Sequence, residues 1–141
     1  ILTCLRLPIT MPGKVAVLTP DAPAPMPVLS QGIICNGMVY VSGSLGIDPS
    51  TGKFVDGTVA DRTDQIFRNI SAILKAAGSN LDNIVKVNIF LTDMSNFQIM
   101  NEAYAKNIPD GVKPVRTCVA VKELPFGSDV EIECVAALES A

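Results

Sequence analysis

Two kinds of apolar spacing divide the chain into predicted helices and strands. From Val59 to Ala77 apolar residues recur at every third or fourth position, and Gly78 follows where such a helix would end. From Val85 to Thr92, valine, isoleucine and leucine occupy every second position. That period is typical of a strand with one buried face. The first stretch therefore predicts a helix and the second a half-buried strand with Val85 on its buried side.

Turn and capping residues locate further elements. The dipeptide Asn36-Gly37 separates two apolar runs and favours both central positions of a type I′ turn, which predicts a β-hairpin. Ser95 and Gln98 form a capping box, which predicts the start of a second helix that ends before Pro109. Further predicted elements are a strand at 14–19, a turn at 48–52 and two strands between 114 and 138.

The predicted order of elements is β-β-β-α-β-α-β-β, which indicates the α+β class. Two helices are too few to cover both faces of a sheet, so we expect them on one face. Residues 14–141 are expected to form a single domain, preceded by an N-terminal extension at 1–13. The 141 residues suffice for one hydrophobic core.

The alternation also assigns side chains to the two faces of the sheet. In the predicted strand at 115–121 the valines and threonine are expected to face the helices, which leaves Arg116 and Cys118 on the opposite face. Glu131 and Phe90 are expected on that opposite face as well. An apolar face that carries charged groups indicates cover by another subunit, because each charge needs a partner there.

Composition narrows the classes of function. The chain is 48% hydrophobic and 18% charged, which is more apolar than a small monomer needs and favours an oligomer. A net charge of -3 gives no basic surface for nucleic acid, so none is expected as a partner. Histidine is absent, which excludes Ser-His-Asp and Cys-His catalysis and removes the usual zinc ligand.

The four cysteines show no CxxC spacing, so no metal or redox site is predicted and free thiols in a reducing compartment are expected. No stretch approaches the roughly 18 apolar residues of a membrane span, so no membrane partner is expected. The first ten residues form only a weak targeting pattern. We therefore expect the cytosol, with a mitochondrial form that has lost a leader as the alternative.

Arg116 admits two interpretations. It could pair with Glu131 or Glu133 at a subunit boundary, and fixed ion pairs are the commoner arrangement. It could instead clamp a ligand carboxylate, since a planar guanidinium makes a two-point fork that lysine does not reproduce. Glu131 is either a solvated strand residue or one that orients water. Cys118 is more often packing than nucleophile, because a thiolate needs a base or a strong positive field.

Other candidates give weaker signals. Gly43 follows Ser42 at the end of a strand, where glycine either lets a ligand approach the backbone or marks a bulge. Asn101 and Tyr104 share one helix face, on which Tyr104 is expected to be core with its hydroxyl at an edge. No glycine-rich phosphate-binding motif occurs.

Residues 114–138 resemble the C-terminal signature of the RidA (YjgF) family. They read PVRTCVAVKELPFGSDVEIECVAAL, against a family pattern of Pro, any residue, Arg, Ser or Thr, Cys, Val, then Leu-Pro and a Glu-Ile-Glu strand. The similarity extends upstream through VYVSGSLGIDPSTG, ILKAAGSNLDNIVKVNIFLTDM and FQIMNEAYAKNI. It therefore spans about residues 28–138 in family order.

The resemblance implies a chorismate-mutase-like α+β fold, with two helices on one face of a mixed sheet, and a homotrimer with ligand clefts between subunits. It implies hydrolysis of reactive 2-imino acids, such as 2-iminobutanoate and 2-iminopropanoate, to 2-oxo acids and ammonia without metal or cofactor. Arg116 would hold the substrate carboxylate and Glu131 would position water. The other pocket positions that the resemblance implies are Leu29, Ser42, Gly43, Phe90, Asn101, Tyr104 and Cys118.

Three positions depart from the family pattern. RidA-type members usually carry a tyrosine in a Pro-Tyr-Ser/Val-Gln-Gly/Ala motif, and here PVLSQG has Leu29 at that place. Ser44 stands where glutamine is frequent, and Gly46 stands where proline is usual. These changes keep the carboxylate clamp and alter the polar wall of the pocket, which bears on substrate range and rate.

Two other functions stay open. A non-enzymatic trimer that binds a small carboxylate, as a sensor or chaperone-like protein, needs only Arg116, and Leu29 is compatible with it. Ribonuclease or translation-inhibiting activity occurs in reports on the family, but the acidic charge and the lack of histidine disfavour it here. A turnover assay tests the first alternative, and the substitution Arg116→Ala tests the second.

Overall fold

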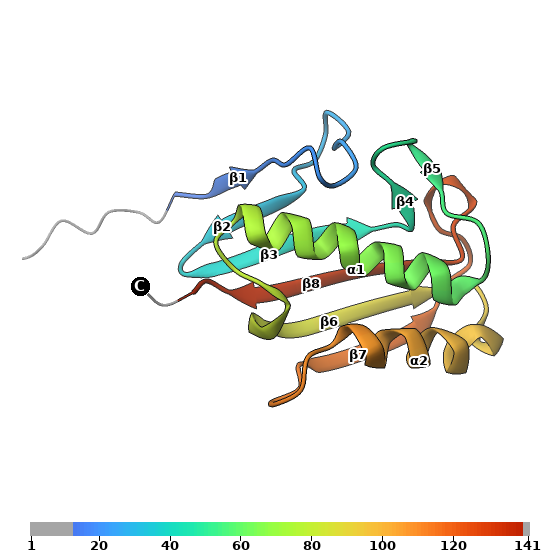
Figure 1. Ribbon diagram of the computed structural model, residues 1–141. Helices are drawn as coiled ribbons and strands as arrows, with labels where there is room; N and C mark the ends of the chain where they lie inside the picture. The colour runs from blue at the N-terminus through green and yellow to red at the C-terminus, as the bar shows by residue number, and fades with distance from the viewer. Residues whose placement is uncertain (1–12, 140–141) are drawn as a thin grey trace, which may run out of the picture.

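The computed structural model describes residues 13–139, so residues 1–12 of the expected N-terminal extension lie outside the described residues. A six-stranded sheet forms the centre of the fold, with both helices on one face (Figure 1). Its strands are β1 Val15–Val17, β2 Gly32–Cys35, β3 Met38–Ser44, β6 Ile84–Leu91, β7 Val115–Ala120 and β8 Val130–Ala137. A separate two-stranded hairpin pairs β4 Ile47–Asp48 with β5 Lys53–Phe54.

The strand order of the sheet is β1-β2-β3-β8-β6-β7. β6 and β7 are parallel, and the other neighbours are antiparallel, so the sheet is mixed. The last strand of the chain thus lies in the middle of the sheet, and β7 lies at its edge beside α2 (Figure 1). The predicted α+β fold with helices on one face is confirmed.

Helix α1, Val59–Ala76, lies across β3 and β8 and covers most of the core (Figure 1). Thr58 and Asp61 form a capping box at its start, and Gly78 follows its end with a φ of 85°. Its apolar stripe buries residues such as Ile66 and Phe67 against the sheet. The helix predicted from periodicity is confirmed.

Helix α2, Phe97–Asn107, begins differently from the prediction. The Asp93 side chain accepts a hydrogen bond from the amide N–H of Ser95 at 2.8 Å and caps a short 3-10 turn, Met94–Asn96. Ser95 is therefore inside that turn rather than at the cap of α2. The capping box of Ser95 and Gln98 was a wrong prediction, because a stronger acceptor two residues earlier starts the turn.

The hairpin at Asn36-Gly37 is confirmed, since both residues have positive φ, 51° and 73°. The predicted faces of β6 need one correction. Its pairing with β8 shifts between Ile84 and Lys86, so Ile84 is buried and Val85 is exposed. The expectation that Val85 faces the core was therefore wrong.

The face assignment of β7 was also wrong. β7 pairs with β6 so that Arg116 lies beside Val87 and Cys118 beside Ile89. Both partners are fully buried under the helices. Arg116 and Cys118 therefore point toward α2, and the valines at 115 and 119 lie on the open face, which is the sheet face without helices. The physical reason is that α2 offers polar and aromatic groups to an arginine at the sheet edge.

The open face carries Glu131 and Phe90, as expected. Glu131 of β8 pairs with Phe90 of β6, and both lie on the face opposite the helices, since their neighbours Val130, Ile132 and Ile89 are buried in the core. No helix within residues 13–139 is both long enough and apolar enough to cross a membrane.

Candidate active site

Arg116 is oriented by α2. Its Nη1 donates a hydrogen bond to Oδ1 of Asn101 at 2.5 Å, and its Cζ lies 4.6 Å from the centre of the Tyr104 ring. The Phe97 ring centre lies 5.8 Å away. These cation–π contacts and the hydrogen bond to the Asn101 side chain fix the plane of the guanidinium. Because Asn101 is its one hydrogen-bond acceptor among residues 13–139, several N–H groups of Arg116 are available to a ligand.

Arg116 makes no ion pair inside the described part of the chain. The one salt bridge among residues 13–139 joins Arg62 to Asp129. Arg116 and the two glutamates that sequence analysis offered as partners, Glu131 and Glu133, leave the sheet on opposite faces. The arginine is therefore held by neutral groups, and its charge is not compensated locally.

Cys118 offers its backbone rather than its thiol. Burial raises the pKa of the thiol, and the charge of Arg116 opposes this rise only in part, so the group is a thiol at neutral pH. The amide of Val121 donates to the carbonyl of Leu91 at 2.7 Å. Since successive amides of a strand alternate in direction, the N–H of Cys118 points away from β6 at the open edge of the sheet.

Glu131 lies directly against the backbone of Gly43. The pairing of β3 with β8 shifts between Val41 and Ser44, which places Gly43 in a bulge. A Cβ atom on Gly43 would collide with the carboxylate of Glu131. The bulge that sequence analysis offered for Gly43 is confirmed, and glycine is what leaves room for this carboxylate.

The environment of Glu131 favours proton acceptance. Burial raises the pKa of its carboxyl above the ordinary value, and repulsion from Glu133 adds to the rise. Asn88 donates a hydrogen bond to Glu133 at 3.0 Å and holds that second charge in place. A carboxylate with a raised pKa is a stronger base, so Glu131 is suited to accept a proton from water.

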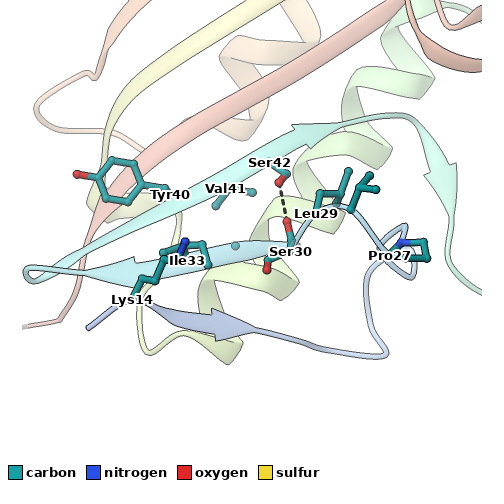
Figure 2. Close-up of a pocket in the computed structure, with 10 residues that line it drawn as sticks. Lys14, Pro27, Leu29, Ser30, Ile33, Tyr40, Val41 and Ser42 are labelled. Carbon is teal, nitrogen blue, oxygen red and sulfur yellow. Dashed lines mark hydrogen bonds between the residues drawn. The ribbon is translucent and has the colours of Figure 1, made fainter. Parts of the chain in front are cut away.

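The loop before β2 brings Leu29 beside Ser42 (Figure 2). The Ser42 hydroxyl donates to the carbonyl of Ser30 at 2.6 Å, and the Ser42 amide donates to the carbonyl of Gln31 at 3.0 Å. Leu29 and Ser42 both line a hollow of about 460 Å³ and a pocket of about 190 Å³ that reaches Glu131. Leu29 therefore forms part of the wall of both cavities.

Gln31 anchors this loop, and sequence analysis did not single it out. Its Oε1 accepts a hydrogen bond from the amide of Thr19 at 2.8 Å, and its Nε2 donates to the carbonyls of Thr19 and Pro23 at 3.0 and 2.9 Å. The side chain is buried. A proline-rich stretch has few amide N–H groups and cannot be held by a β-ladder, so side chains must bond its backbone instead. A glutamine close to such a stretch was therefore the available signal.

Arg62 and Asp129 form a second link that sequence analysis missed. The Nε and Nη2 atoms of Arg62 donate to the two carboxylate oxygens of Asp129 at 2.7 and 2.6 Å. This bidentate pair ties the start of α1 to the residue that precedes β8, two positions before Glu131. The partners are 67 positions apart, so no local spacing could have revealed the pair.

The candidate residues fall into two groups. The edge group, at β7 and α2, consists of Arg116, Cys118, Asn101 and Tyr104. The open-face group, on β3, β8, β6 and the loop before β2, consists of Leu29, Ser42, Gly43, Phe90 and Glu131.

These two groups are separated within one chain. Strand β6 lies between β7 and β8, and the side chains of Arg116 and Glu131 leave the sheet on opposite faces. Two strand spacings alone amount to roughly 10 Å. A single chain therefore does not bring the arginine and the glutamate to one small molecule.

No group of three or more cysteine, aspartate or glutamate side chains within residues 13–139 is arranged to hold a metal ion.

Comparison with known proteins gives a consistent set of relatives. A family model described as Endoribonuclease L-PSP matches residues 19–138. The protein named Reactive Intermediate Deaminase A, chloroplastic, of Arabidopsis thaliana is 43% identical over 125 residues, which are 89% of this chain and 66% of the relative. The 2-iminobutanoate/2-iminopropanoate deaminase of Rattus norvegicus is 41% identical over 120 residues, 85% of this chain and 87% of the relative.

The fold has close structural relatives as well. The crystal structure of yeast Mmf1 superposes with a TM-score of 0.86 at 41% identity and covers 90% of this chain and 100% of that chain. The resemblance inferred from residues 114–138 is thereby confirmed.

Proposed function

Because the chain belongs to the RidA family, which the Endoribonuclease L-PSP model describes, we propose that it hydrolyses reactive 2-imino acids to 2-oxo acids and ammonia. Two relatives carry names of deaminases. The observation that carries the proposal is Arg116, a guanidinium held flat by Asn101 and Tyr104 with several donors free. Such a group is suited to a carboxylate, which every 2-imino acid carries.

In this proposal the edge group binds the substrate. Arg116 takes the two carboxylate oxygens in a fork, and the outward N–H of Cys118 donates to the substrate next to the carboxylate. These contacts fix the imine carbon relative to the protein. Orientation of this kind lowers the barrier substantially, since it removes the entropy of bringing the reactants together.

The open-face group supplies the water. Glu131 accepts a proton from a water molecule as the water oxygen bonds to the imine carbon, and the proton passes to the nitrogen. The hydroxyl proton of this intermediate then passes to the nitrogen as the carbon–nitrogen bond breaks, so ammonia leaves and a carbonyl oxygen remains. An imine carbon is already electrophilic, so the proposed reaction requires neither a metal nor a cofactor, and the absence of histidine from the chain is compatible with it.

The two groups meet only if a second copy contributes one of them. We therefore place the proposed site between subunits, with the edge group of one copy against the open-face group of the next. The open face supports this arrangement, because Tyr40 and Val119 expose apolar surface there that a neighbour would cover. A closed homotrimer gives every copy both neighbours and forms one such site at each boundary.

The compartment stays a prediction. The cytosol was expected, and relatives with names that place them in chloroplasts and mitochondria are compatible with the organelle alternative.

The test is release of ammonia and 2-oxo acid from imines generated in situ by an amino-acid oxidase. Wild type should accelerate release over the blank, and Arg116→Ala should lower kcat/KM about 100-fold or more, as expected when charge-assisted bonds are lost. Arg116→Lys keeps the charge but cannot make the two-point fork, so it should recover only a small part of the wild-type kcat/KM. Arg68→Ala removes an arginine from α1, outside both groups, and serves as the control.

Two other outcomes would redirect the assignment. Binding of 2-oxo acids that depends on Arg116, without turnover of any imine, would indicate a carboxylate-binding protein rather than an enzyme. RNA cleavage that Arg116→Ala leaves unchanged would indicate the activity in the family model's description, although the net charge of -3 disfavours it.

A further inference from the structure

A small pocket beside Glu131 has a wall that the proposed hydrolysis does not use. It holds about 190 Å³ and is bounded by the bulge at Gly43, the loop of Leu29 and the loop before β8. Pockets that enclose a whole drug-sized ligand hold roughly 300–1,000 Å³. This pocket is therefore sized for one side chain of a substrate rather than for a nucleotide.

Three large apolar side chains stand at the pocket although they lie outside the core. Met26 is 53% exposed, Leu29 46% and Phe126 71%. They come from two loops that are far apart in the sequence, and they converge beside one carboxylate. Exposed apolar side chains that gather at a single concave site mark a surface that meets an apolar group.

Phe126 also adopts a backbone conformation that bulky residues rarely take. Its φ is 57°, in the left-handed region, where glycine or asparagine fits with less strain. The side chain is mostly exposed, so core packing does not compensate the strain. A strained and exposed phenylalanine at the rim of a pocket points to a contact with something outside the chain's own core.

We propose that this pocket receives the substrate's side chain, so that the protein prefers 2-imino acids with large apolar side chains, as derived from leucine or methionine, over the methyl group derived from alanine. The inference rests on the proposed function. Three groups branch from the imine carbon: the nitrogen, the carboxylate and the side chain. With the carboxylate on Arg116 and the water at Glu131, the nitrogen and the side chain are left, and of these two the apolar side chain suits the apolar wall of the pocket that adjoins Glu131.

Leu29 fits this preference. A tyrosine at this position, which is usual in the RidA pattern, would bring a hydroxyl group into the wall. Leucine leaves that part of the wall apolar, and its neighbours Met26 and Phe126 extend it. A hydroxyl or charged group on the substrate side chain that meets Met26, Leu29 and Phe126 would lose hydration without gaining a hydrogen bond from that part of the wall, which disfavours polar side chains.

The test compares kcat/KM for imines derived from leucine and from alanine. Wild type should prefer the leucine-derived imine by about tenfold or more, as expected for extra methylene groups in an apolar pocket. Leu29→Ser and Phe126→Asn should each reduce that ratio to about threefold or less. Asparagine is chosen because it tolerates a positive φ. Val112→Ser, at an apolar position that is 99% exposed and outside the pocket, should leave the ratio unchanged.

A second readout separates this inference from the proposed function. Calorimetric binding of 4-methyl-2-oxopentanoate should be tighter than that of pyruvate, and the two pocket variants should remove the difference. If no imine is hydrolysed but this order holds, the deaminase proposal fails and the pocket assignment stands. A wild-type ratio near one in both readouts overturns the pocket assignment. So does a change of oligomer mass in the variants without a change of ratio, because the pocket would then bury a subunit contact.

Discussion

A single glycine determines where the carboxylate of Glu131 lies. Gly43 sits in the β3 bulge with no side chain, and the space that a Cβ atom would need is taken by the carboxylate oxygen. The sequence signal for this was only a glycine after Ser42 at a strand end. Gly43 matters because it lies against Glu131, which is 88 positions later in the chain (131 − 43). Local spacing could not reveal that contact.

Gly43→Ala should therefore affect activity more than stability. The colliding atoms are at the free end of a flexible side chain, so Glu131 can swing away at a cost of about 1 kcal/mol or less in the free energy of unfolding. The displaced carboxylate no longer holds water at the right place, and kcat/KM should fall about 100-fold. Urea denaturation and the imine assay measure the two effects. Gly13→Ala, which meets no atom within 4 Å, is the control.

Loss of stability without loss of activity in Gly43→Ala would contradict this reasoning, since it would mean that the Glu131 carboxylate is not used in turnover.

The raised pKa of Glu131 predicts the acid side of the pH profile. Glu131 must be ionised to accept a proton, so kcat/KM should fall as the pH drops through a pKa above the ordinary carboxyl value. Burial is the larger cause of the rise and repulsion by Glu133 the smaller. Glu133→Gln removes the repulsion, so the midpoint should move to lower pH, while the exposed Glu102→Gln should leave it in place. An unmoved midpoint in Glu133→Gln would show that another group titrates.

The strands show how far alternation predicts a sheet. Alternation predicted the correct face for Glu131 and Phe90, because β8 and β6 are central strands and each has an apolar side in the core. It failed at β7, where valines lie on the open face and Arg116 lies under α2. The element that covers one face of an edge strand, here α2, is not specified by the sequence of the strand itself. The side of Arg116 was decided by Asn101 and Tyr104, on another element.

The Arg62–Asp129 pair should be a measurable link between α1 and the loop before β8. Both side chains are partly buried and the two bonds are parallel, so Arg62→Ala should lower the free energy of unfolding by about 1–3 kcal/mol. Arg68→Ala, on the same helix with one bond of 3.3 Å to Gln65, should change it by less than about 0.5 kcal/mol.

A double-mutant cycle with Asp129→Asn identifies the source of that effect. If the pair itself is responsible, Arg62→Ala should cost much less in the Asp129→Asn background. Equal costs in both backgrounds would assign the loss to packing of the arginine stem or to its bond with the carbonyl of Gly57.

The molecule as a whole presents the edge group and the open-face group on opposite faces of its sheet. Each is well formed on its own: the edge group around a stacked guanidinium, the open-face group around a carboxylate with a raised pKa. Sequence similarity indicated all nine candidate residues but not that they form two separate groups. Similarity alone does not say whether candidate residues meet within one chain or between two. The division follows from the strand order, in which β6 separates β7 from β8.

This division predicts complementation between two inactive variants. Arg116→Ala and Glu131→Gln should each be inactive alone, because every site then lacks one of the two groups. In a mixed trimer of the proposed arrangement, a boundary between the intact arginine of one chain and the intact glutamate of the next is complete. Random assembly of equal amounts makes about a quarter of all boundaries complete, so about a quarter of wild-type activity should return. Native mass spectrometry of co-expressed chains would establish that mixed oligomers formed. Mixed oligomers without activity would mean that both residues serve the same chain's site, and the arrangement between subunits would then be wrong.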